Sequence, residues 1–149
     1  MEHELYVGQQ KILFDREATL ALYRQTIKVP GADRCSCIGC KNFTAQRGNV
    51  FPDKFIKLLN NVGVDPLTEW EAFDYDFDAK EHRKQVLYGG WFLFAGELVE
   101  GLDKRPGPAQ KGFAYWFTTS FPAGTLPKGL KLCAIEFLGE IPWVLPERP

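Results

Sequence analysis

Three cysteine residues lie within six positions of this sequence, at Cys35, Cys37 and Cys40. Thiols at this density are typical of a metal site, of redox chemistry or of a tightly packed turn. The two-residue gap between Cys37 and Cys40 lets a turning backbone direct both thiolates at one zinc ion, and Cys35 can add a third ligand from the same loop. The spacing therefore makes these three residues candidate zinc ligands.

A closed structural zinc site needs a fourth ligand, which is normally Cys or His. The remaining candidates in the sequence are Cys133, His82 and His3. Cys133 alternates with Ile135 and Phe137, so we expect it to be a small residue of the hydrophobic core. His82 lies among charged residues, which is typical of a solvated turn. No second Cys-x-x-Cys pair occurs, so the choice of the fourth ligand stays open.

A second hypothesis for the same loop is thiol redox chemistry, with a reversible disulfide between Cys37 and Cys40. The N-terminus of a helix lowers the pKa of a nearby thiol, and Cys40 precedes an expected helix that starts near Lys41. The strand–helix–strand context of thioredoxin-like sites is missing around this pair. A third hypothesis is that all three cysteines are reduced thiols packed in a turn.

The composition is that of an ordinary globular chain. Of its 149 residues, 45% are hydrophobic and 25% are charged, and the formal net charge is −1. A near-neutral balance argues against nucleic-acid binding, which depends on a basic surface. The sequence shows no signal-peptide pattern and no apolar run long enough to span a membrane, so we expect a cytoplasmic protein that binds no membrane. Thiols are kept reduced in the cytoplasm, which disfavours a structural disulfide.

Helices are expected in the first half of the chain, with Asp15 as the N-cap of the first one. A strand over residues 20–29 is the competing interpretation of that segment. The first dozen residues are expected to form an extended lead-in. The expected helices cover residues 16–26, 40–47 and 52–62, and Gly63 caps the last.

From residue 73 onward the hydrophobic period changes to two, which is typical of strands. Residues 85–99 are apolar on both faces, so we place them in the centre of a sheet, and Gly89–Gly90 predicts a bulge or a close backbone approach. The other expected strands are 73–77, 113–121 and 130–137, and the segment 141–144 closes the chain. Helices come first and strands follow, so the predicted fold class is α+β. Short N-terminal helices would pack on an antiparallel β-sheet of about four to six strands, in a single domain over residues 1–149.

Two groups of acidic residues offer other chemistry. Glu97 and Glu136 lie within apolar strands and would form an acid–base pair if they faced one another, although both can equally point to solvent. The alternating aspartates at 74–78 lack the glycine and the final glutamate of a calcium loop, so we expect a strand edge with its charges outward. The sequence has none of the common nucleotide-binding or hydrolase motifs and gives no positive case for an enzyme.

The cysteine segment carries a recognisable motif: a Cys-x-x-Cys pair, a basic residue, Asn and an aromatic residue, followed by an aromatic–Pro pair. In this sequence the motif is Cys37-Ile38-Gly39-Cys40-Lys41-Asn42-Phe43, followed by Phe51-Pro52. Further segments complete the pattern: Val62-Gly63-Val64-Asp65-Pro66, Tyr88-Gly89-Gly90-Trp91, Ala95-Gly96-Glu97, Ile135-Glu136-Phe137 and Ile141-Pro142-Trp143-Val144. Over roughly residues 15–145, the chain resembles a family of small uncharacterised bacterial proteins. The resemblance implies a cytoplasmic, single-domain bacterial protein and no particular activity. It includes Cys35 and the Cys-x-x-Cys pair but no counterpart of Cys133, which argues against a four-cysteine site.

The sequence thus predicts a non-enzymatic cytoplasmic module in which Cys35, Cys37 and Cys40 bind structural zinc. The aromatic content of 14% suits a strand-rich core, and we also expect the aromatic-rich sheet to bind a protein partner. One alternative is a thiol-redox or sensor protein that uses a Cys37/Cys40 disulfide. Another is a metal-free interaction protein of the immunity type, which would neutralise a toxin by occlusion.

Overall fold

The computed structural model describes residues 2–26, 30–75, 85–103, 112–121 and 129–146, and it confirms the α+β class. The helical elements in these ranges are α1 (Arg16–Thr26), the 3₁₀ helix η1 (Gly31–Arg34), α2 (Ile38–Ala45) and α3 (Asp53–Val62). The strands in these ranges are β1 (Glu2–Val7), β2 (Gln10–Asp15), β3 (Glu71–Asp74), β4 (Gln85–Glu100), β5 (Phe113–Thr118) and β6 (Leu132–Pro142). None of the helices in the described ranges is long and apolar enough to cross a membrane.

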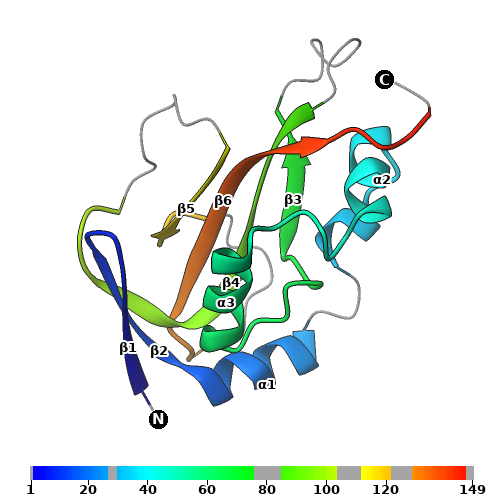
Figure 1. Cartoon of the computed structure of the whole chain (residues 1–149). Helices are drawn as coiled ribbons and strands as arrows, with labels where there is room; N and C mark the ends of the chain where they lie inside the picture. Colours follow the sequence, from blue (N-terminus) through cyan, green and yellow to red (C-terminus); the bar gives the residue numbers. More distant parts are fainter. Residues whose placement is uncertain (1, 27–29, 76–84, 104–111, 122–128, 147–149) are drawn as a thin grey trace.

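The described strands form one antiparallel sheet of six strands in the order β1-β2-β4-β6-β5, with β3 paired to β4 (Figure 1). As predicted, β4 lies in the centre: it pairs with β6 along one edge and with β3 and then β2 along the other. Gly90 allows the predicted close approach, because a Cβ atom there would collide with the Glu71 carbonyl and lie 2.8 Å from Cζ of Phe137. Strand β6 is longer than predicted and runs on to Pro142, because its pairing with β4 continues through Gly139.

A cluster of aromatic rings fills the space between the helices and one face of the sheet. Phe51 lies just before α3 and Phe55 lies in its first turn, and their rings lie 5.0 Å from Phe137 and 5.0 Å from Phe113, respectively. The rings in contact across this layer are those of Phe43, Phe51, Phe55, Tyr88, Phe92, Phe113 and Phe137. Much of the aromatic content is therefore buried in the core, where each ring contributes both apolar area and edge-to-face contacts.

Helix α1 has the predicted start, because the Asp15 carboxylate accepts the backbone N–H of Ala18 at 3.0 Å. The alternative strand over 20–29 is wrong for residues 20–26, which are helical; residues 27–29 lie outside the described part of the chain. The helix lies against β4, where Tyr23 donates its hydroxyl hydrogen to the Leu93 carbonyl at 2.6 Å. On the same helix, Thr19 Oγ1 accepts the N–H of Ala95 at 3.0 Å. The Leu93 carbonyl and the Ala95 N–H belong to a part of β4 that pairs with neither β3 nor β2. Side chains of α1 therefore supply hydrogen-bond partners for these backbone groups.

The first residues are not a lead-in but a β-hairpin, formed by β1 and β2. Val7 pairs with Gln10, so the turn has only two residues, and its first residue, Gly8, has a φ of 57°. Glycine adopts this left-handed conformation without the steric cost that a Cβ atom brings, and such turns match the twist of the strands.

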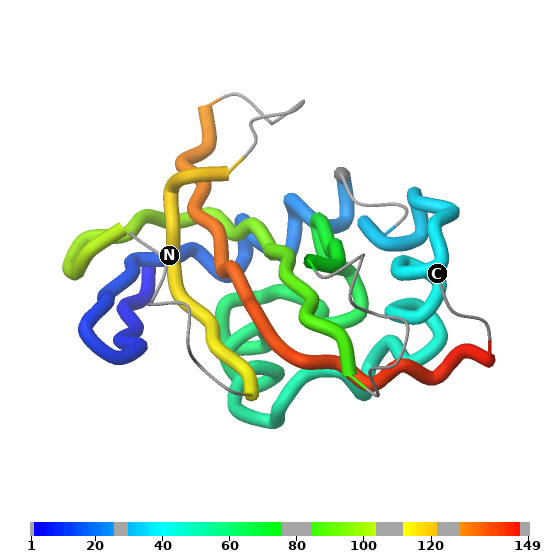
Figure 2. The backbone as a smooth tube through the Cα atoms, turned by 90° about the horizontal axis from the view of Figure 1, so that it is seen from above, coloured from blue at the N-terminus to red at the C-terminus, as the bar shows by residue number. Residues whose placement is uncertain are grey.

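The C-terminal end of β6 crosses to the helical side and runs beside α2 (Figure 2). Asn42 on α2 is fully buried and links the two elements: its amide nitrogen donates to the Pro142 carbonyl at 3.0 Å, and its amide oxygen accepts the N–H of Val144 at 2.8 Å. The same amide nitrogen donates to the hydroxyl of Tyr88 at 3.2 Å. Helix α2 is therefore held on the sheet by a buried polar contact with the strands β4 and β6.

Candidate metal centre

The cysteine loop, residues 35–40, joins η1 to α2. Cys37 has the extended backbone of a helix N-cap, with φ −69° and ψ 158°, and α2 begins at Ile38. The Cys37 sulfur accepts the backbone N–H of Cys40 at 3.4 Å, and the Cys37 carbonyl accepts that of Lys41 at 3.1 Å. The sequence predicted that this helix starts at residue 40, but it starts at Ile38. The earlier start is possible because the Cys37 sulfur takes the place of the usual capping oxygen.

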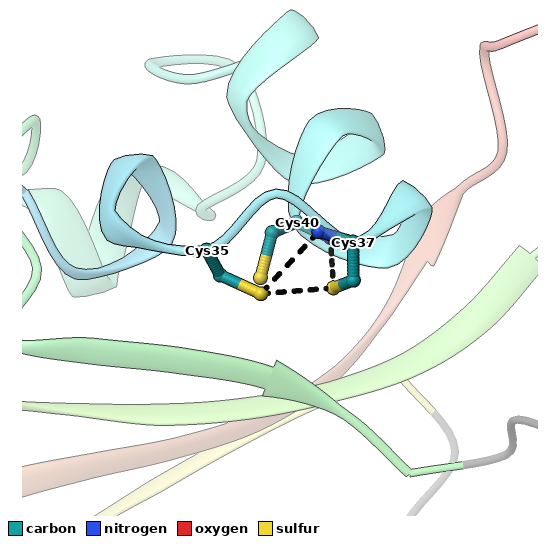
Figure 3. Close-up of side chains that lie close together, drawn as sticks. All are labelled: Cys35, Cys37 and Cys40. Atoms are coloured by element: carbon teal, nitrogen blue, oxygen red, sulfur yellow. Dashed lines mark hydrogen bonds between the residues drawn. The ribbon is translucent and has the colours of Figure 1, made fainter.

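The three sulfur atoms converge on the same side of this loop (Figure 3). All three Sγ atoms of Cys35, Cys37 and Cys40 lie within 4.8 Å of one another. Those of Cys35 and Cys37 are 3.1 Å apart, and Cys35 Sγ also accepts the backbone N–H of Cys37 at 3.4 Å. Around tetrahedral zinc, with Zn–S bonds of about 2.3 Å, sulfur atoms are separated by about 3.8 Å. The three sulfur atoms therefore lie close to the spacing that such a site needs.

The thiols differ in exposure and in acidity. Cys35 and Cys37 are exposed, whereas Cys40 is buried. Hydrogen bonds from the Cys37 backbone N–H, and then from the side chains of Cys37 and Cys40, lower the pKa of Cys35. Burial raises the pKa of Cys40, so the expectation that the helix N-terminus activates this thiol is wrong. Of Cys35 and Cys40, the more acidic thiol is therefore that of Cys35, which is exposed and lies outside the helix.

Behind the loop, a buried ion pair holds η1 against α2. Glu69 is fully buried, and Arg47 donates to its carboxylate at 2.5 Å and to the Asp33 carboxylate at 3.0 Å. The same Glu69 carboxylate accepts the backbone N–H of Ala32 at 3.0 Å. Together these bonds tie η1, which precedes the cysteine loop, to the segment that follows α2, because Ala32 and Asp33 belong to η1 and Arg47 follows α2.

Strand β3 brings a carboxylate to the same loop. A Cβ atom on Gly39 would collide with the Asp74 carboxylate and lie 2.8 Å from its Cγ atom. The sequence placed the charges of this segment outward, and for Asp74 that expectation is wrong: Tyr75 is the exposed residue, at 38%, and Asp74 lies against α2. At residues 73–75 the alternation itself is correct, but the two faces are reversed; residues 76–78 lie outside the described ranges.

The other sequence candidates do not join this cluster in the part of the chain that the structure describes. Cys133 is fully buried in β6, where its thiol donates to the Thr118 carbonyl at 3.4 Å, and burial raises its pKa to about 12. This matches its interpretation as a core residue. His3 lies on the β1–β2 hairpin, with its ring 5.5 Å from that of Phe14. His82 is outside the described residues.

The two strand glutamates are not brought face to face. Glu136 on β6 lies opposite Trp91 on β4 and Trp116 on β5. Glu97 lies beyond the paired part of β4 and β6, opposite Leu13 on β2, and its carboxylate is 3.4 Å from Lys131 Nζ. The register therefore gives no acid–base pair between them.

The fold and the site together define an α+β chain with a preformed cluster of three thiols on a surface loop. Thiolates are soft ligands that select zinc, copper(I) or iron–sulfur clusters, so the residues present fit a soft metal ion. No family model, no curated protein and no solved structure matches this chain significantly. The site must therefore be interpreted from its own geometry and chemistry.

Proposed function

We propose that this chain is a non-enzymatic, cytoplasmic bacterial module that binds one zinc ion through Cys35, Cys37 and Cys40. The observation that carries the proposal is the convergence of three sulfur atoms within 4.8 Å, on a loop whose flanking segments are held together by the Glu69 carboxylate. Zinc needs no redox change and accepts thiolates readily, so it suits a loop in a reducing compartment. Bound there, the ion would tie η1 to the first turn of α2.

We propose further that the outer face of the sheet binds a protein partner. Phe73, Trp91 and Phe121 line a cavity of about 290 Å³, together with Thr118, Ser120, Ala134 and Glu136. The strand residues among them, such as Phe73, Trp91 and Glu136, alternate with residues that face the helices and so lie on the opposite face of the sheet. The partly exposed ring of Trp91 lines this cavity and offers a partner an aromatic, apolar contact. A Trp91→Ala variant should lose any partner that co-purifies with the wild type.

A second candidate function is thiol redox chemistry, and the structure favours a different pair from the one expected. Cys35 and Cys37 are both exposed, with sulfurs 3.1 Å apart, and the pKa of Cys35 is lowered chiefly by the Cys37 backbone N–H. In exchange with a small disulfide, the Cys35 thiolate would attack one of its sulfur atoms, form a mixed disulfide and release the first thiol. The Cys37 thiolate would then attack the Cys35 sulfur of the mixed disulfide, form the Cys35–Cys37 disulfide and release the second thiol. Cys40 is buried and less acidic, so it would not be the attacking thiol.

Metal titration of the reduced, metal-free protein tests the main proposal. Cobalt(II) is a spectroscopic substitute for zinc, and its thiolate charge-transfer band reports the number of sulfur ligands. We expect one cobalt ion per chain, displaced by zinc, and a loss of the band in the Cys37→Ser variant. The matched control is Cys133→Ala, which should bind like the wild type. Absence of the band in the wild type would refute zinc binding, and a Cys35–Cys37 disulfide in oxidised protein would then favour the redox function.

A further inference from the structure

We propose that Asp74 is the fourth protein ligand of the metal ion, which makes the centre one of three sulfurs and one carboxylate oxygen. The inference rests on the proposed metal binding and extends it, because three cysteines alone leave one position of tetrahedral zinc to water or another ligand. It also replaces the fourth ligands that the sequence suggested. Among the described residues, no histidine, no further cysteine and no carboxylate belongs to the group of ligand atoms within 4.8 Å of one another that Cys35, Cys37 and Cys40 form. The Asp74 carboxylate, which lies against Gly39, must therefore move closer to the sulfur atoms when the metal binds.

The first argument is topological. Strand β3 pairs only with β4 in the described sheet, and its other side lies next to η1 and α2. Asp74 is the last residue of β3 and lies on the same face as Ala72, which is 2% exposed and part of the core. The side chain of Asp74 is therefore directed to the helical side of the sheet. Figure 3 shows the three sulfurs on the side of the loop that faces this strand.

The second argument is the contact with Gly39. This residue lies between Cys37 and Cys40, and its missing side chain leaves the space that the Asp74 carboxylate fills. The carboxylate thus rests on the backbone of the metal loop itself, and only glycine at position 39 leaves that space. The Gly39 carbonyl accepts the hydroxyl hydrogen of Tyr88 at 2.6 Å, which holds this part of the loop on β4.

The third argument is chemical. Carboxylate oxygen is a normal zinc ligand, with bonds of about 2.0–2.2 Å. The positive end of the α2 dipole lies at the same loop and offsets part of the negative charge that a fourth anionic ligand adds. A centre of this kind is held by η1, α2 and β3 at once, so metal binding would fasten the helical segment to the edge of the sheet.

The decisive experiment replaces the oxygen ligand with sulfur. In an Asp74→Cys variant, X-ray absorption of the zinc form should show four sulfur neighbours, whereas the wild type should show three sulfurs and one lighter atom. An Asp74→Ala variant should bind zinc at least about tenfold more weakly in a chelator competition, since even the residues that only orient metal ligands are worth that much. Asp53→Asn, at the exposed start of α3, is the matched control and should bind like the wild type.

A Gly39→Ala variant adds a test that removes no ligand. Alanine favours the helix, so α2 should stay folded, but its methyl group must displace the Asp74 carboxylate. Zinc affinity should fall while the far-ultraviolet circular dichroism is retained. Three sulfur neighbours in Asp74→Cys, with wild-type affinity in Asp74→Ala, would overturn the inference and leave the three-cysteine site standing. If the wild type binds no zinc at all, the proposed function itself fails.

Discussion

Replacing Glu69 with alanine should destabilise the protein far more than its single charge suggests. Glu69 is fully buried, and its carboxylate is bonded to the Arg47 guanidinium and to the N–H of Ala32. Removing one partner of a buried ion pair costs about 3–5 kcal/mol, because the remaining charge is left without compensation. Arg47 is 17% exposed and keeps Asp33 as a partner, so the lower end of that range applies, at about 3 kcal/mol. The unpaired Ala32 N–H adds to this cost.

The assay is urea denaturation followed by tryptophan fluorescence, with thermal unfolding in parallel. For a chain of this size, about 3 kcal/mol corresponds to a fall in Tm on the order of 10 °C. The control is Asp33→Asn, because Asp33 is 37% exposed and its ion pair should contribute less than about 1 kcal/mol. A Glu69→Ala variant within 1 kcal/mol of the wild type, or an Asp33→Asn variant that is equally unstable, would refute this account of how the cysteine loop is positioned.

Three further predictions concern individual side chains. In the metal-free protein, iodoacetamide should modify Cys35 first, because its thiol is exposed and its pKa is lowered, and peptide mass mapping at short times checks the order. Asn42→Ala should lower the free energy of unfolding by about 3 kcal/mol in urea denaturation, because it removes three hydrogen bonds and leaves buried partners unpaired. Burial raises the pKa of Cys133 to about 12, so above about pH 9 the unfolded state loses this proton before the folded state does. The stability of the wild type relative to Cys133→Ala should then fall as the pH rises from about 9 to 12, by at most about 1.4 kcal/mol per pH unit, and a parallel pH dependence of the two proteins would contradict it.

The features that the sequence predicted well are those fixed by short-range chemistry. Asp15 caps α1 through a bond to a residue three positions away, and Gly63 ends α3 in the left-handed conformation, so both signals are local. The cysteine cluster is local in the same sense, because ligands within six residues stay together in almost any fold. The long apolar run of β4 was also clear, since a strand buried on both faces needs apolar residues throughout.

What the sequence did not reveal depends on contacts between distant segments. Asp74 lies 34 residues after Cys40, and only the pairing of β3 with β4 decides which of its faces meets α2. A one-residue change of that register would reverse the two faces. The direction of the pKa shift of Cys40 was predicted wrongly for a related reason. Burial raises this pKa, and the burial depends on the packing of α2 on the sheet. The β1–β2 hairpin had a local signal, Gly8 at the first position of a two-residue turn, but little hydrophobic alternation around it.

The most direct test of the account is to measure zinc content and accessible thiols together on freshly purified protein, by native mass spectrometry and thiol titration before and after a chelator. We predict one zinc ion per chain, with the thiols of Cys35 and Cys37 protected until the chelator removes the metal. Cys133 should react only after denaturation in either state. A protein without metal, even when zinc is supplied during purification, whose exposed thiols react at the same rate with and without chelator, would contradict the central claim.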